Sequence, residues 1–188
     1  MDNRSNILKC ALELFAARGY DAIGVQEICE AAGITKPTLY HYFGNKRGVL
    51  DSLVREQCGP FVTQLTQAAD YNGDLPLTLQ KMVTVYFQFA LHHPAFYRMQ
   101  LAMWIALPEN EAFQVVAAAN EEQHQIVEAM FLRATADHGN MRGRRRIYAA
   151  TFIGMVNTYI ALALNGYLEL NDMVAQQAVH QFSHGIYS

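Results

Sequence analysis

The segment from Val25 to Phe43 constrains the fold more than any other part of the sequence. Apolar residues recur at helical spacing in Val25–Ala32 and again in Lys36–Phe43, and only a short turn joins the two runs. Gly33 can adopt a positive φ and turn the chain sharply, and Thr35 can cap the helix that follows. Two short helices with so tight a connection are typical of a helix-turn-helix.

The second of these helices has two different faces on a helical wheel. Leu39 and Phe43 point inward, and the opposite face carries hydroxyl, aromatic and cationic groups: Lys36, Pro37, Thr38, Tyr40, His41 and Tyr42. This surface suits a DNA major groove, because Thr and His can hydrogen-bond base edges while Tyr and Lys reach phosphates. Lys46 begins the next helix, where its charge and the exposed N–H groups would form a phosphate clamp. The alternative is a helical hairpin whose exposed polar residues are only solvated.

The rest of the chain also has a helical pattern. No run alternates strictly enough to demand a strand, so the predicted fold class is all-α. Ser5 or Asn6 is the expected cap of a first helix that ends at Gly19, and Asn45 the expected cap of a helix from Lys46 to about Ala68. Further helices are expected at about 75–93, 95–107, 110–137, 141–168 and 172–186.

The stretch GYDAIGVQEICEAAGITKPTLYHYFGNKRGVL, residues 19–50, closely resembles the DNA-binding segment of TetR-family (tetracycline-repressor-like) transcription regulators. The resemblance implies an all-α homodimer. Its N-terminal part, 1–47, would be a three-helix helix-turn-helix DNA-binding domain, and 48–188 a helical effector-binding and dimerisation domain. Carried over by position, the DNA contacts would be Gln26, Thr35, Lys36, Pro37, Thr38, Tyr40, His41, Tyr42 and Lys46.

The sequence departs from the family pattern at Ile23-Gly24, where the family usually has Thr or Ser at the start of the second helix. A phosphate-contacting hydroxyl and a strong cap would therefore be missing, although Gly can still serve as a cap. Gln26 then remains as the side-chain contact from that helix. The departure bears on the affinity for DNA more than on the mode of binding.

The middle of the chain is rich in Met and aromatic residues. Any one of them can be plain core, but their number also suits a cavity for a small apolar or aromatic effector. Asn120, His124 and Tyr86 are possible polar anchors in such a cavity. The candidate effector residues are Met82, Tyr86, Phe89, Met103, Trp104, Phe113, Asn120 and His124.

From Ile147 to Leu168 the chain has 22 residues without a charge, preceded by three arginines. Length and basic flank both suit a membrane span, but the polar residues and glycines within the stretch speak against one. The family resemblance implies instead that about 141–168 and 172–186 pack with their mates into a four-helix dimer interface. We therefore expect a homodimer, no membrane insertion and a cytoplasmic location.

Catalytic and metal motifs are incomplete. Glu121-x-x-His124 lacks a second such pair, His180 and His184 lack a third ligand, and the three cysteines form no CxxC pair. We expect no enzyme activity, no cofactor and no metal. The predicted function is a ligand-responsive regulator, a repressor, that binds a palindromic operator in double-stranded DNA as a homodimer and leaves it when an effector binds. The alternative is a helical dimer that has lost DNA binding and acts as an interaction module or small-molecule binder.

Overall fold

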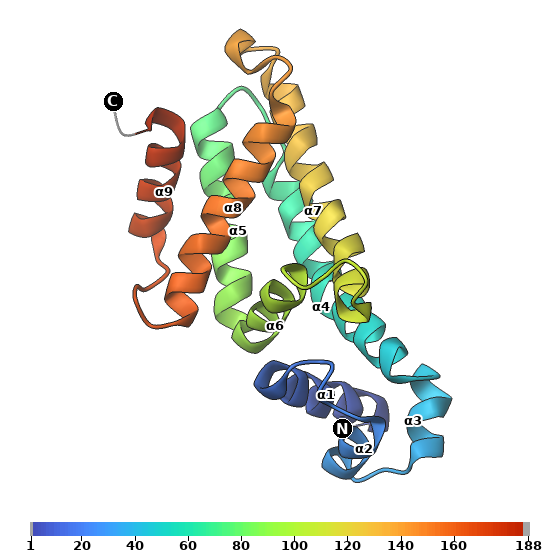
Figure 1. Cartoon of the computed structure of the whole chain (residues 1–188). Helices are drawn as coiled ribbons and strands as arrows, with labels where there is room; N and C mark the ends of the chain where they lie inside the picture. The colour runs from blue at the N-terminus through green and yellow to red at the C-terminus, as the bar shows by residue number, and fades with distance from the viewer. Residues whose placement is uncertain (1, 186–188) are drawn as a thin grey trace. The chain divides into compact units, whose positions relative to one another are not determined.

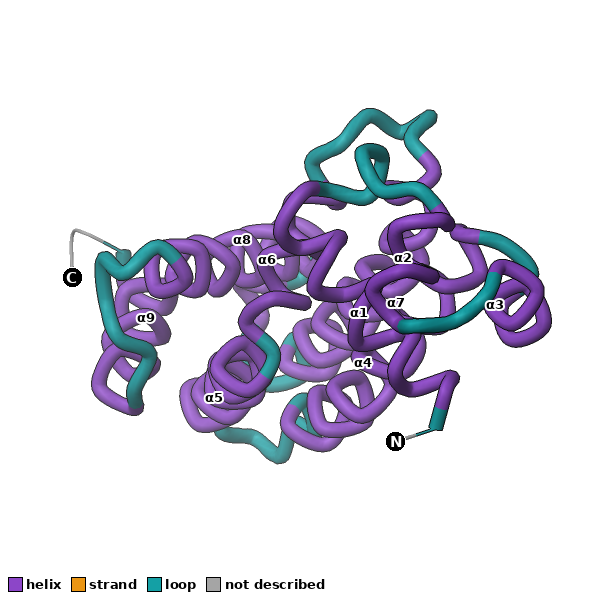
Figure 2. Tube along the Cα trace, turned by 90° about the horizontal axis from the view of Figure 1, so that it is seen from below, coloured by secondary structure: helices purple, strands orange, loops and turns teal. Residues whose placement is uncertain are grey.

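The computed structural model describes residues 2–185, with the side chain of Asn140 excepted. The regular secondary structure of this part of the chain is entirely helical (Figure 1). Helices and loops alternate along it and no strand occurs between residues 2 and 185 (Figure 2), which confirms the all-α prediction. The helices are α1 Asn3–Arg18, α2 Val25–Ala32, α3 Lys36–Phe43, α4 Lys46–Ala68, α5 Leu75–His92, α6 Pro94–Trp104, α7 Glu111–Ala134, α8 Arg145–Leu164 and α9 Asp172–His184, with a 3-10 turn at Gly139–Met141.

Several helix ends differ from the predicted ones. The cap of α1 is Asp2, whose carboxylate accepts a hydrogen bond from the Ser5 N–H, so the choice of Ser5 or Asn6 was wrong. α8 begins at Arg145 and not at 141, because Gly143 has φ 77° and the chain cannot run through it as a right-handed helix. Gly166, with φ 78°, lies just beyond the other end. α6 and α7 are likewise shorter than predicted, and residue 186 lies outside the described residues.

The chain forms two compact units. Unit 1 consists of 1–59 and 95–119, and unit 2 of 60–94 and 120–188. Each unit is therefore built from two stretches of the sequence, and both α4 and α7 continue from one unit into the other. Within α4 the change of unit falls at Gly59-Pro60. Pro60 has no N–H to donate, so the helical hydrogen-bond ladder is interrupted there.

Unit 1 has a core between its three N-terminal helices. α1 packs against α2, and α2 against α3. Ile7, Ile28 and Leu39 are fully buried, one from each helix. Burial of such aliphatic side chains stabilises the packing by about 1.5–3 kcal/mol each.

Unit 2 has an aromatic core where α8 and α9 pack against each other and against α5. The rings of Phe131, Phe152 and Phe182 contact one another, with centroids 5.6–6.4 Å apart. α8 is also long and apolar enough to cross a membrane, and only 28% of its most apolar 18-residue stretch is buried. A large part of its apolar surface is thus uncovered in the single chain.

Candidate nucleic-acid interface

The turn between α2 and α3 has the conformation that its sequence predicts. Gly33 is left-handed, with φ 64°, and the Ile34 N–H donates to the Cys29 carbonyl over 3.0 Å. Thr35 lies at the N-cap position of α3, but its hydroxyl is 3.0 Å from the Thr38 hydroxyl and makes no bond to a backbone N–H. Thr35 is therefore a cap by position only, and its hydroxyl instead hydrogen-bonds to the Thr38 hydroxyl in the first turn of α3.

The two faces of α3 are separated as the helical wheel predicts. Leu39 is fully buried and Phe43 is 9% exposed, which fixes the inner face. The candidate DNA contacts on the other side of the helix are exposed, apart from Thr38, which is half-buried: Lys36, Pro37, Thr38, Tyr40, His41 and Tyr42. The outer face thus presents one cation, aromatic rings and hydroxyl groups to solvent without a carboxylate among them.

α2 begins without the hydroxyl that the family usually has. Gly24 is the N-cap, and the Glu27 carboxylate accepts a hydrogen bond from its N–H over 2.8 Å. The Arg18 guanidinium also contacts this carboxylate, with 2.6 Å between Nη1 and Oε1. The backbone hydrogen bond and then the contact with Arg18 lower the pKa of Glu27. Ile23 is 1% exposed and belongs to the core. Gln26 is exposed and donates one N–H to the Glu30 carboxylate over 2.7 Å, which leaves its second N–H and its carbonyl oxygen for a contact with DNA.

Lys46 is directed into the protein. Its ammonium donates to the carbonyls of Tyr20 and Ile23, each over 3.1 Å, and lies 4.0 Å from the centroid of the Tyr20 ring. Two of the three N–H donors of Lys46 thus bind the loop between α1 and α2. The sequence predicts that Lys46 contacts a DNA phosphate. In the structure Lys46 also holds the loop between α1 and α2, and its third N–H remains for the predicted phosphate contact.

We expect Lys46→Met to lower the free energy of unfolding by about 1–3 kcal/mol, because two partly buried carbonyls lose their donor while the apolar stem is kept. Urea denaturation measures this change, and Lys9→Met, on the exposed side of α1, is the control. Unchanged stability, combined with a salt dependence of DNA binding that falls by about one unit, would show that Lys46 acts on phosphate alone.

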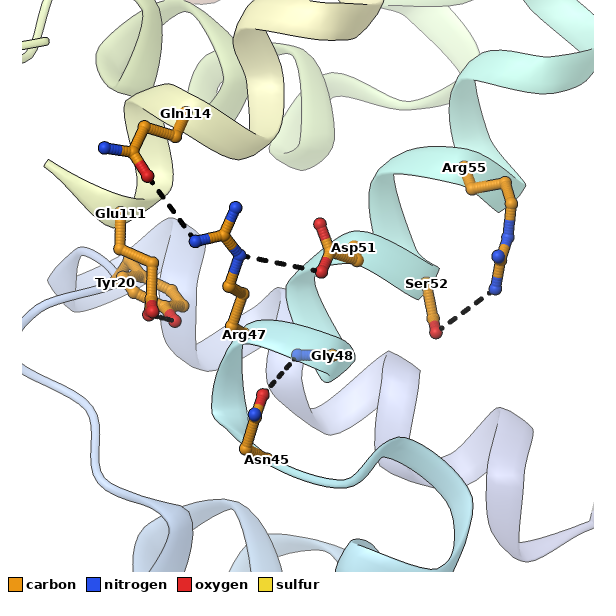
Figure 3. Close-up of polar contacts among 9 residues, drawn as sticks. All are labelled: Tyr20, Asn45, Arg47, Gly48, Asp51, Ser52, Arg55, Glu111 and Gln114. Carbon is orange, nitrogen blue, oxygen red and sulfur yellow. Dashed lines mark hydrogen bonds and ion pairs between the residues drawn. The ribbon is translucent and has the colours of Figure 1, made fainter.

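A set of polar contacts joins the N-terminal helices of unit 1 to the beginning of α7 (Figure 3). The Tyr20 hydroxyl donates to the Glu111 carboxylate. The pKa of Tyr20 is raised, mainly because the hydroxyl is buried and to a smaller extent because of this hydrogen bond. The Arg47 guanidinium donates a hydrogen bond to the side-chain oxygen of Gln114 over 3.4 Å, and its Nε atom forms an ion pair with the Asp51 carboxylate at 3.9 Å. These contacts were missed from the sequence, because 91 residues separate Tyr20 from Glu111 and no local pattern connects them.

The first turn of α4 approaches the end of α3 closely. The Asn45 side chain accepts a hydrogen bond from the Gly48 N–H over 2.8 Å (Figure 3), which confirms Asn45 as a cap. A Cβ atom on Gly48 would lie 1.9 Å from the carbonyl oxygen of Phe43. A side chain at this position would force one of the two helices to shift, so the absence of a Cβ atom on Gly48 permits this close approach.

The eight candidate effector residues are divided between the two units. Met103, Trp104 and Phe113 belong to unit 1, where the rings of Trp104 and Phe113 stack with centroids 5.4 Å apart. The others belong to unit 2: Met82, Tyr86 and Phe89 are buried on α5, while Asn120 and His124 are half-buried on α7. Within unit 2, the Phe61 ring contacts both Tyr86 and Phe89.

The geometry of unit 1 agrees with a known family. Residues 7–53, which run from α1 into α4, match the sequence model described as "Bacterial regulatory proteins, tetR family". The HTH-type transcriptional activator FasR of Mycolicibacterium smegmatis is 26% identical over 187 residues, which cover 98% of this chain and 82% of FasR. Residues 7–53 thus form a TetR-type DNA-binding segment. The chain as a whole is similar to TetR-family transcriptional regulators, which are not enzymes.

Two further transcriptional regulators are similar. The HTH-type transcriptional repressor KstR2 of Rhodococcus jostii is 29% identical over 126 residues, which cover 65% of this chain and 60% of KstR2. FadR of Bacillus subtilis, solved in complex with stearoyl-CoA, superposes with a TM-score of 0.80 over 97% of this chain and 99% of FadR, at 19% identity. The described residues thus have the fold of TetR-family regulators.

Proposed function

We propose that this TetR-family regulator is a repressor that binds a palindromic operator as a homodimer and leaves it when a small apolar effector binds. In this proposal 1–47 read DNA in the cytoplasm, and 48–188 bind the effector and dimerise. The observation that carries the proposal is the outer face of α3, where Lys36, Tyr40 and His41 are exposed above the buried Leu39. The effector would have to bind more tightly to the conformation that cannot bind DNA.

Selection of bound duplexes from a random DNA pool tests the proposal. We expect enrichment of a palindrome whose half-sites are about 34–36 Å apart, since the two recognition helices of a symmetric dimer enter successive major grooves. The logarithm of the binding constant should fall linearly with the logarithm of the salt concentration. If a folded dimer enriches no sequence at low salt, the helix-turn-helix does not read DNA and the chain is an interaction module or small-molecule binder.

His41→Ala should change which bases the selected operators carry, because His41 is exposed on the outer face of α3 and is proposed to contact a base edge. We expect a loss of discrimination of about 1–3 kcal/mol at one position in each half-site. Lys81→Ala, an exposed cation on α5, is the control and should leave the preferred sequence unchanged. An identical base preference for His41→Ala would remove this residue from the groove.

The proposed dimer forms through α8 and α9. Along α8 an uncharged stripe runs from Ile147, 67% exposed, to Leu162, 39% exposed. A groove of about 610 Å³ follows this stripe, lined by Thr151, Met155 and Thr158 together with Phe182 of α9. We assign a second copy to this surface because a symmetric pair would cover both apolar stripes at once. The chain would then be a dimer without detergent, and recovery in the membrane fraction alone would contradict the proposal.

An apolar effector is supported by two observations of different kinds. The relative FadR was solved with stearoyl-CoA, so an acyl chain is the first class of effector to test. In unit 2 the Tyr86 hydroxyl is fully buried, and it has no hydrogen-bond partner in the part of the chain that the structure describes. A buried hydroxyl without a partner is unfavourable, so a polar atom of the effector would gain a ready donor there.

Tyr86→Phe separates this role from a role in the core. Without effector, the free energy of unfolding should stay within about 1 kcal/mol of the wild type or rise, since an unsatisfied hydroxyl is removed and the ring is kept. The effector concentration that releases DNA should rise about fivefold to tenfold if the hydroxyl binds the effector. Phe89→Leu is the control for a change of ring packing alone. Unchanged release by Tyr86→Phe would assign Tyr86 to the core.

A further inference from the structure

Unit 1 contains a cleft that the proposed function does not use. It lies between the second half of α1 with its following loop and α6 with its following loop, and it measures about 490 Å³. Volumes of this size are typical of small-molecule pockets. Of the candidate effector residues, Met103 alone is among its lining residues.

The floor of the cleft is apolar. Phe15, Met99 and Met103 line it and are only 2%, 3% and 6% exposed. The hollow remains open because the lining residues Ala16 and Ala102, from α1 and α6, have side chains too short to fill it. A ligand body of carbon atoms would therefore lie against a fixed apolar surface and displace water from it.

The rim of the cleft carries cations. Arg18 and Arg98 line it together with the carboxylate of Asp21, which already accepts a hydrogen bond from Asn110 over 2.7 Å. Arg18 donates to Glu27 through one N–H at 2.6 Å. A guanidinium has five N–H donors in a fork, so Arg18 can bind a second carboxylate while this bond persists.

We propose that the cleft binds an amphiphilic organic anion, with its apolar body on Phe15, Met99 and Met103 and its carboxylate at Arg18 and Arg98. Such a ligand would touch the loop that carries Tyr20 and Asp21. The carbonyls of this loop hold Lys46, and its side chains bind the beginning of α7. Occupancy of the cleft is therefore placed to alter the geometry of the DNA-binding helices independently of the effector proposed for unit 2.

Photo-crosslinking of the full chain with a ten-carbon carboxylic acid that carries a diazirine tests the proposal. Peptide mapping should find the label on the segments that contain Phe15, Met99 and Met103. The primary amide of the same probe should label these segments at least fivefold less, because it lacks the charge that the two guanidinium groups bind. Labels only outside these segments, or equal labelling by acid and amide, would overturn the proposal.

Two variants sharpen the experiment. Ala102 is exposed, so Ala102→Phe should fill the cleft without disturbing the core and abolish labelling of the segments that contain Phe15, Met99 and Met103. Arg98→Gln should reduce it about fivefold, while Arg55→Gln, an exposed arginine of α4 in the same unit, should leave it unchanged. Full labelling of Ala102→Phe with an unchanged melting curve would contradict the assignment. Since labelling is read without DNA, failure here is distinct from failure to bind an operator.

Discussion

Gly48→Ala is expected to destabilise unit 1 by about 3 kcal/mol or more and to abolish operator binding. The new Cβ would lie 1.9 Å from the carbonyl oxygen of Phe43. No rotation of a side chain relieves such a contact, because both atoms are fixed to the backbone. Either α4 loses its first turn or α3 moves, and each outcome changes how the outer face of α3 is presented. Urea denaturation and operator titration measure the two effects.

Gly59→Ala is the matched control on the same helix. A Cβ at Gly59 meets no atom within 4 Å beyond its chain neighbours, and the residue is exposed. The helix preference of Ala over Gly is about 1 kcal/mol, and crowding against Pro60 opposes it. We therefore expect a change of stability within about 1 kcal/mol and normal operator affinity. Equal effects of the two substitutions would show that the approach of α4 to Phe43 does not decide the geometry.

Thr158→Arg is expected to raise the dissociation constant of the dimer by at least 100-fold. Thr158 is exposed on α8 and lines the groove along its uncharged stripe. In a symmetric interface the change places two guanidinium groups against apolar surface, and burial of an unpaired charge costs about 3–5 kcal/mol. A monomer offers one recognition helix, so operator affinity should fall with it. Analytical ultracentrifugation and operator titration report the two losses.

Thr66→Arg provides the same substitution on another helix. Both threonines are exposed, and both hydroxyls donate to the carbonyl four residues earlier, Thr158 to Gly154 over 2.9 Å and Thr66 to Val62 over 2.8 Å. The substitution therefore removes the same local bond in each case. Thr66→Arg should leave the dimer intact, and dissociation of both variants, or of neither, would contradict an interface on α8.

The sequence predicted those features that depend on neighbouring residues. The positive φ of Gly33, the cap by Asn45 and the burial of Leu39 and Phe43 follow from rules that act within one or two turns of a helix. The short helices of the helix-turn-helix therefore have the predicted bounds. Errors occurred where several residues compete for one role, as at the start of α1, where Asp2 precedes Ser5 and Asn6.

Contacts between distant segments could not be predicted in this way. A sequence shows that Lys46 carries a charge, but the direction of its side chain depends on the loop carbonyls of Tyr20 and Ile23. The hydrogen bond between Tyr20 and Glu111 depends on how the start of α7 packs within unit 1, which the sequence does not show. The placement of Met103 and Tyr86 in different units has the same origin, because hydrophobic character alone does not say which core a residue joins.

The composition of unit 1 has a consequence for protein engineering. A chimera that grafts residues 1–47 onto a foreign sensor would leave Tyr20 without Glu111, and Arg47 without Gln114. A transplant of the whole of unit 1 would keep these partners together, and it consists of two stretches, 1–59 and 95–119, with the intervening segment supplied by the host. Transfer of the proposed DNA-binding helices to another protein is therefore expected to depend on a segment taken from the middle of the chain.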